Sequence, residues 1–259
     1  MGRPAIILAA GAGLLLGLMA AGLAAEDPAP APKPAPAPAM TPEERAAKVK
    51  EASAARLQKA VENLEKQLGG VREYETKLSS DVTAALSKAG IGGKNAKGGG
   101  KFDQAFTKDD YPPELLEARN IGIACARKLI ELDGRYAACA AAAVSLQNMA
   151  ERTHDEAPKA SVQQVADSIW QGRRANLERI AGIFGAVGDY RDAAAIYIKI
   201  AQIMPKDKRN DADLGTLKQA VQDLQTRQAK ILEDRRKYKQ EQMAKNNSSN
   251  SHNVRRSGG

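Results

Sequence analysis

Apolar residues recur at alternating steps of four and three along residues 57–85. These positions are Leu57, Val61, Leu64, Leu68, Val71, Leu78, Val82 and Ala85, with Glu75 in the one skipped place. Such spacing puts every member on one face of an α-helix, as in a coiled coil. Thr41 and Pro42 are typical of a helix start. The pattern therefore predicts a coiled-coil-like helix over 41–89.

Two adjacent glycines, Gly69 and Gly70, interrupt this seam. Together they cost roughly 2 kcal/mol of helix propensity. The seam nevertheless stays in phase across them, which favours one long helix that is bent at the glycines. The alternative is two helices folded back on each other at this point.

A second heptad seam lies near the C-terminus and predicts a basic helix over 208–245. Its apolar positions are Leu217, Val221, Leu224, Ile231 and Tyr238, with Gln228 and Arg235 in skipped places. Stripes this narrow are not stable alone, so we expect the two heptad helices to associate, with each other or across a homo-oligomer. The polar segment 246–259 is expected to be a disordered tail.

Residues 111–207 lie between the two seams and are expected to form a compact helical domain. At an offset of 54 residues the chain matches itself in apolar or small character. Ile123, Ala126, Ile130, Gly134, Tyr136, Cys139, Ala143 and Leu146 fall on Leu177, Ile180, Phe184, Gly188, Tyr190, Ala193, Tyr197 and Ile200. Helical stripes on both sides of a glycine predict two helical hairpins that turn at Gly134 and Gly188.

The second of these hairpins, at about 174–207, resembles a tetratricopeptide repeat. The family's small, aromatic and closing proline positions are filled here by Leu177, Ile180, Ala181, Phe184, Ala193, Tyr197 and Pro205. The unit at about 120–152 is degenerate, because Arg127 stands at a small position and Glu151 replaces the proline. The resemblance implies a protein-binding surface on stacked helices; a generic helical hairpin is the alternative.

Two segments are expected to be linkers. Residues 26–40 are rich in proline and alanine and predict an extended spacer. Residues 90–110 begin with a glycine- and lysine-rich run. This run is not a phosphate-binding loop, because Lys101 is followed by Phe102 rather than by serine or threonine.

The first 25 residues are typical of a signal peptide or an N-terminal anchor. Arg3 precedes an uncharged apolar stretch, and Gly22 to Ala25 offer small residues for cleavage. We therefore expect an exported protein, periplasmic or extracellular, and in the uncleaved alternative one anchored in the inner membrane and held near it.

The chain is basic, with a net charge of +8, and residues 1–25 contribute only one of these charges. For an exported chain, nucleic acid is not an expected partner. An acidic envelope polymer or a membrane surface is the alternative to a protein partner.

No residue pattern suggests catalysis, a cofactor or a metal. The two histidines, His154 and His252, lack ligand spacing to each other or to a cysteine. Cys125 and Cys139 lie on either side of Gly134; they are expected to be either a disulfide or two buried free thiols.

Taken together, these patterns predict an all-α protein with tetratricopeptide-like hairpins flanked by long heptad helices. The expected function is an exported cell-envelope scaffold or adaptor that binds other proteins and is not an enzyme. The alternative is a basic helical adaptor for an acidic envelope polymer or a membrane surface.

Overall fold

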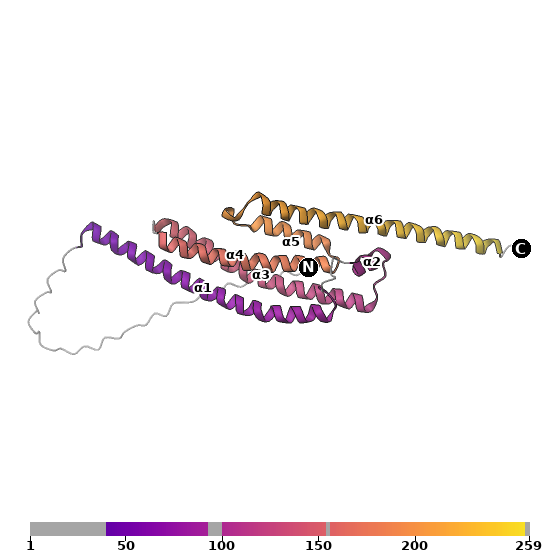
Figure 1. Ribbon diagram of the computed structural model, residues 1–259, viewed down its shortest axis with the longest axis horizontal. Coiled ribbons are helices and arrows are strands. Elements are labelled where there is room, and N and C mark those ends of the chain that lie inside the picture. Colours follow the sequence, from indigo (N-terminus) through magenta and orange to yellow (C-terminus); the bar gives the residue numbers. More distant parts are fainter. Residues whose placement is uncertain (1–39, 93–99, 154–155, 257–259) are drawn as a thin grey trace, which may run out of the picture. The chain divides into compact units, whose positions relative to one another are not determined.

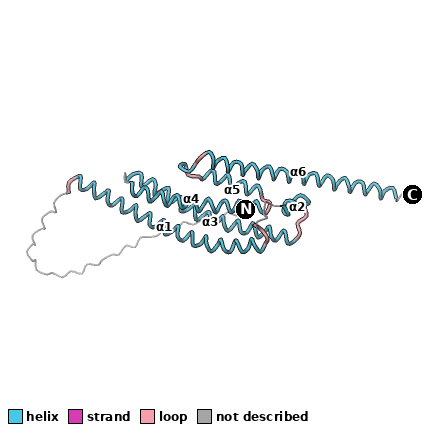
Figure 2. The backbone as a smooth tube through the Cα atoms, viewed as in Figure 1, coloured by secondary structure: helices cyan, strands magenta, loops and turns pink. Residues whose placement is uncertain are grey.

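The computed structural model describes residues 40–92, 100–153 and 156–256 (Figures 1 and 2). Most of these residues are helical and none lies in a strand, which confirms the all-α fold class. The elements are α1 (Pro42–Lys88), α2 (Gly100–Lys108), α3 (Pro113–Thr153), α4 (Glu156–Ala186), α5 (Tyr190–Ile203), a 3-10 turn η1 (Lys206–Lys208) and α6 (Asp211–Arg256). The described residues from Pro42 onward form one compact unit.

Several predicted features lie outside the described residues. They are the signal or anchor at 1–25, all but the last residue of the 26–40 linker, part of the 90–110 linker, and His154. Within the described ranges, no helix combines the length and the apolar character that a membrane crossing needs.

Helix α1 runs without a break through Gly69 and Gly70, as the phase of the seam predicted. Its buried residues are seam positions: Leu57, Val61, Leu64, Leu68, Val71, Leu78 and Val82. This face packs against α3 and α4. The partner of the α1 seam is therefore the α3–α4 pair of the same chain, which offers a broader apolar surface than the narrow stripe of α6.

The predicted turn at Gly134 is wrong. Helix α3 is continuous from Pro113 to Thr153, so the degenerate unit at 120–152 is one stretch of helix and not a hairpin. A single glycine costs a helix only about 1 kcal/mol, and the alanine-rich stretch after Gly134 strongly favours helix. The unbroken helix α3 packs against α4, the next helix of the chain.

The predicted turn at Gly188 is present and joins α4 to α5. Gly188 has φ of 81°, a left-handed conformation that favours glycine. The Asp189 amide closes the turn by donating to the carbonyl of Phe184 at 2.8 Å. Residues 174–203 therefore form a helix, a turn and a second helix, as the hairpin prediction required.

A buried carboxylate ties three helices together. Asp133 of α3 is 3% exposed and accepts hydrogen bonds from Arg173 of α4 at 2.8 Å and Lys199 of α5 at 2.7 Å. Burial alone would raise the pKa of Asp133, but the two cations hold it below its usual value. The pair of cations thus keeps this carboxylate charged in the core.

Helix α6 packs against α5 and α2. Leu217 of its seam is buried, while Val221, Leu224, Ile231 and Tyr238 are half-buried. The helix continues to Arg256, so the expected disordered tail over 246–259 is largely helical in the structure. The continuation is understandable because no proline or glycine occurs between Asn246 and Arg256.

The expected linker at 90–110 also contains structure. Its second half contains α2, which packs against α6 and touches α3. Ala105 is the buried residue of this short helix. The expectation of a linker came from the glycine-rich run that precedes α2.

Candidate functional site

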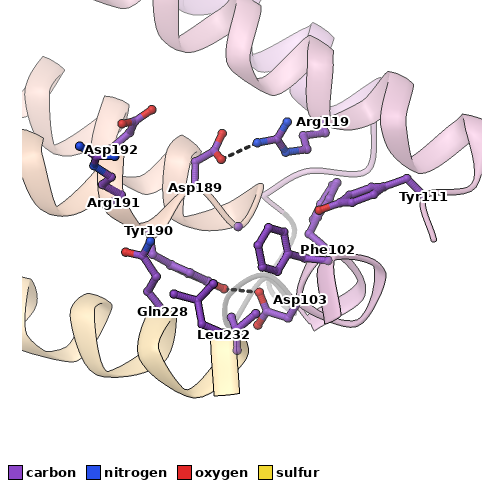
Figure 3. Close-up of a pocket in the computed structure, with 13 residues that line it drawn as sticks. Phe102, Asp103, Tyr111, Arg119, Asp189, Tyr190, Arg191, Asp192, Gln228 and Leu232 are labelled. Atoms are coloured by element: carbon purple, nitrogen blue, oxygen red, sulfur yellow. Dashed lines mark hydrogen bonds and ion pairs between the residues drawn. The ribbon is translucent and has the colours of Figure 1, made fainter. Parts of the chain in front are cut away.

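Aromatic side chains are scarce in this chain, yet four of them line one cavity. The chain has one tryptophan, six tyrosines and three phenylalanines. Phe102, Phe106, Tyr111 and Tyr190 surround a space of about 270 Å³, here called the junction cavity. Its walls come from α2, the segment leading into α3, the α4–α5 turn and α6 (Figure 3).

Asp103 of α2 is the polar centre of the junction cavity. It accepts a hydrogen bond from the Tyr190 hydroxyl at 2.7 Å. Its carboxylate also forms an ion pair with the Arg227 guanidinium at 2.8 Å. Arg227 also lies over the Tyr190 ring, 4.9 Å from its centroid. Burial, followed by the hydrogen bond to Asp103, raises the pKa of Tyr190, so its hydroxyl remains a donor at neutral pH.

The opposite wall carries an ion pair between α3 and the turn. Arg119 donates to Asp189 at 2.5 Å (Figure 3). Tyr111 lies beside this pair, and burial raises its pKa. The turn residue Gly188 lines the same wall. An ideal Cβ there would lie 3.4 Å from the Phe102 Cβ, an ordinary van der Waals contact, so the positive φ rather than lack of space favours glycine at this position.

Helix α6 closes the cavity with Gln228, Ile231 and Leu232. One turn further on, Arg235 lies 4.6 Å from the centroid of the Phe106 ring and donates to Asp109 at 2.6 Å. At two positions on α6, Arg227 and Arg235, an arginine therefore stacks on an aromatic ring and also pairs with a carboxylate.

The carboxylates around the cavity are all paired with cations. Asp103, Asp109 and Asp189 form ion pairs with Arg227, Arg235 and Arg119, respectively. No cluster of three or more histidine, cysteine, aspartate or glutamate side chains suited to a metal is found within the described ranges. The junction cavity is therefore a charged and aromatic contact surface.

A second hollow, here called the hairpin groove, lies on the α3–α4 pair. Its volume is about 900 Å³, and it is lined by α3 from Ala140 to Glu151, α4 from Lys159 to Arg173, and the segment 203–207 after α5. Many of the lining side chains are small or apolar: Ala140, Ala143, Val144, Ala150, Ala160, Val162, Ala166, Ile169, Trp170, Ile203 and Pro205. Val144 is 55% exposed.

A polar network crosses the hairpin groove. Gln147 of α3 donates to Gln163 of α4 at 3.0 Å. Gln163 in turn donates to Asp167 at 2.9 Å and to Asp207 of η1 at 3.3 Å. Asp167 also pairs with Lys208 at 2.8 Å. The network fixes α3, α4 and η1 relative to one another and gives the groove a defined width.

The residues that the repeat resemblance singled out lie mainly in the core. Leu177, Ile180, Ala181, Phe184, Tyr190 and Ala193 are buried, and Tyr197 is half-buried. Gly188 and Tyr190 also line the junction cavity, and Pro205 lines the hairpin groove. These positions hold the hairpin together and reach both hollows only at its ends.

The cysteines are both buried and unbridged. They lie on one continuous helix, 14 residues apart, which separates them by about 21 Å along its axis. The structure thus has the second of the two expected alternatives, two buried free thiols. Burial raises the pKa of each thiol, so neither is an activated nucleophile.

Sequence reasoning missed α2 and with it three residues that line the junction cavity, Phe102, Asp103 and Phe106. The segment "GKFDQAFTK" carries Phe102 and Phe106 four residues apart, on one face of a helix, next to Asp103. That spacing was the available signal. Nothing local, however, indicated that α6 would supply arginines to this face from more than 120 residues away.

Comparison with protein-family models, with curated proteins and with solved structures finds no match to this chain.

Proposed function

We propose that this chain is an exported helical scaffold that binds other proteins, and that a partner helix lies in the hairpin groove. The observation that carries the proposal is the lining of this groove. Its alanines allow a second backbone to approach closely, while Val144, Ile203 and Trp170 offer apolar contact. An amphipathic helix with bulky apolar side chains is the occupant that fits a groove floored by small ones.

Helix α5 gives the precedent for this mode of packing. It packs on α4, and its buried residues are Tyr190, Ala193, Ala194 and Ile200. The hairpin groove begins where α5 ends, since Ile203 and Pro205 line it. A partner helix would therefore extend, on the α3–α4 pair, the surface that α5 already uses.

The sequence resemblance supports the same class of function. The α4–α5 hairpin resembles a tetratricopeptide unit at 174–207, and that family binds proteins on stacked helices. The N-terminal 25 residues suggest that the partner is met outside the cytoplasm. Both points come from sequence patterns, and they add to the support that the lining of the groove provides.

An acidic polymer or a membrane surface fits the structure less well as a partner. Basic side chains of α6 are needed for such binding, but Arg227, Arg235 and Lys239 pair with Asp103 and Asp109 of the same chain. Lys237 likewise pairs with Glu233. This pairing reduces the positive field that α6 can present.

The test is capture of partners from an envelope extract by the full chain, compared with two matched variants. Val144→Glu places a charge in the hairpin groove. Ile130→Glu places one on the same helix outside the groove, at a side chain that is 40% exposed. We expect a protein that stays bound in high salt, is lost with Val144→Glu and is retained with Ile130→Glu.

Two other results would contradict the proposal. Equal capture by both variants would show that the groove is not the binding surface. Capture of an acidic polymer that disappears in high salt would favour the electrostatic alternative, because surface charge interactions are screened by salt.

A further inference from the structure

Charge and ring stacking, more than apolar burial, hold α2 in place. The helix has nine residues and one buried side chain, Ala105. A helix this short is not stable alone. Its contacts to other elements are mainly with α6. Helix α2 is therefore helical because α6 holds it there.

The matching face of α6 is defined by five residues, Arg227, Ile231, Leu232, Arg235 and Lys239, and is here called the α6 seat. Asp103 of α2 pairs with Arg227. Asp109, at the end of α2, pairs with Arg235 at 2.6 Å and with Lys239 at 3.3 Å. Arg235 lies over the ring of Phe106, between the two acids. Along α6, the seat thus contacts an acidic side chain, then an aromatic side chain, then a second acidic side chain.

The seat is incompletely filled by α2. The junction cavity remains between Phe102 and Phe106 on one side and Ile231 and Leu232 on the other. Leu232 stays 40% exposed. Side chains that face empty space lose the dispersion contacts of a close-packed interior. A helix with larger apolar residues at these places would fit the same seat better.

We propose that the α6 seat is a docking site for an acidic, aromatic helix of a partner protein, with α2 as its intramolecular occupant. The partner presents a carboxylate and an aromatic side chain three residues apart on a helix, with a second carboxylate just past the helix end, as Asp103, Phe106 and Asp109 do. The α6 seat is separate from the hairpin groove, so an experiment can disprove binding at one of the two sites without affecting the other.

The tether sets a bound on the affinity of α2 for the seat. A covalently linked segment has an effective concentration in the millimolar range. Because α2 is docked, the dissociation constant of the same segment, added as a separate peptide, must lie below about 1 mM. This bound makes α2 itself a usable probe.

The experiment measures binding of a labelled peptide of residues 100–111 to the full chain by fluorescence anisotropy. The resident α2 is weakened with Asp103→Asn and Phe106→Ala, and circular dichroism checks that the chain remains helical. We expect the peptide to bind this variant at least tenfold more tightly than the wild-type chain, where the resident α2 competes. Adding Arg227→Gln and Arg235→Gln should abolish the binding.

Three results would overturn the proposal. The first is equal affinity for the wild-type chain and the weakened variant. The second is no binding to the helical, weakened variant at about 1 mM peptide, the bound set by the tether. The third is a wild-type dimer in sedimentation that dissociates on adding the peptide, since the occupant would then be α2 of a second copy. If the double variant loses helicity, Phe106→Ala alone is used to weaken the resident α2. Val144→Glu, in the hairpin groove, should leave peptide binding unchanged.

Discussion

The hydroxyl of Tyr136 donates a hydrogen bond to Glu75 Oε2 at 2.6 Å and so joins α3 to α1 at the one skipped position of the heptad seam. Tyr136 is 1% exposed, and its ring packs against Gly172 of α4, where there is no Cβ to exclude it. The acidic residue that interrupts the apolar pattern of α1 is therefore the partner of a buried hydroxyl.

Removing this hydroxyl should destabilise the protein. Tyr136→Phe leaves the Glu75 carboxylate without its donor, and we expect the free energy of unfolding to fall by about 1–2 kcal/mol. The control is Tyr238→Phe, since the Tyr238 hydroxyl has no hydrogen-bond partner in the described part of the chain and should change stability by less than about 0.5 kcal/mol. Urea unfolding compares the two, and equal effects would mean that the bond contributes nothing specific.

Gly172 should not tolerate a side chain. An ideal Cβ at this position would lie 2.6 Å from the Tyr136 hydroxyl oxygen and 2.8 Å from ring carbons. We expect Gly172→Ala to destabilise by roughly 1–3 kcal/mol through overpacking. Gly182, also within α4, has open space around it, and Gly182→Ala should stabilise by about 0.5–1 kcal/mol through helix propensity. Thermal unfolding of both variants decides, and stabilisation by both would show that α4 can move away from Tyr136.

The two glycines once expected to be equivalent turns should respond oppositely to alanine. Gly134 lies inside α3 with nothing near its missing Cβ, so Gly134→Ala should stabilise by about 0.5–1 kcal/mol. Gly188 has φ of 81°, and Gly188→Ala should destabilise by about 1–2 kcal/mol. Urea unfolding measures both changes. Loss of stability in both variants would restore the turn at Gly134 and contradict the continuous α3.

Ala193 should mark the closest approach of α5 to the core. It is 0% exposed, and Ala193→Leu is expected to cost roughly 1–3 kcal/mol through overpacking. Ala195, two residues further along the same helix, is exposed and should accept leucine within about 0.5 kcal/mol. Both changes are alanine to leucine, so helix propensity is matched, and thermal unfolding of the two isolates packing. Equal stability would remove the evidence for a close-packed hairpin.

The thiols of Cys125 and Cys139 should be protected in the folded protein. Mass spectrometry after alkylation without reductant is expected to find neither thiol modified at neutral pH and both modified in urea. Rapid alkylation of the folded chain would contradict their burial. A chain that stays unalkylated in urea and has the mass of an intramolecular disulfide would contradict their free state.

The same burial predicts a stability change at alkaline pH. The pKa of each thiol is raised in the folded chain, so unfolded thiols ionise first. Their contribution to stability is full below the ordinary thiol pKa of about 8.5 and is lost as pH rises through the folded values. The pKa of Tyr136 is raised as well, which acts in the same direction. The unfolding free energy should fall from about pH 8.5 upward.

Local periodicity was enough to predict α1, the α4–α5 hairpin and the start of α6. Seven of the eight apolar positions predicted for the α1 seam are buried and Ala85 is half-buried, because a heptad spacing specifies a helix face without reference to its partner. What covers the seam could not be predicted. The broad apolar faces of α3 and α4 compete with any second narrow stripe, and this competition depends on three-dimensional packing rather than on local pattern.

The errors arose where glycine was given too much weight. Gly134 was read as a turn because Gly188 is one, yet only Gly188 adopts a positive φ. The glycines before α2 led to the reading of the whole of 90–110 as a linker. At Gly134 the modest intrinsic cost of glycine in a helix is outweighed, whereas α2 begins only at Gly100, at the end of the glycine-rich run.

The single unbroken seam of α1 also constrains how the chain can change length. One residue inserted beside Gly70 would rotate everything before it by about 100° and carry Leu57 to Leu68 off the α3–α4 pair. Seven residues would restore the facing side to within about 20°. Residues 42–56 bury no side chain and bear no such restriction. Insertions and deletions in relatives of this protein should therefore accumulate before Leu57 and occur in multiples of seven after it.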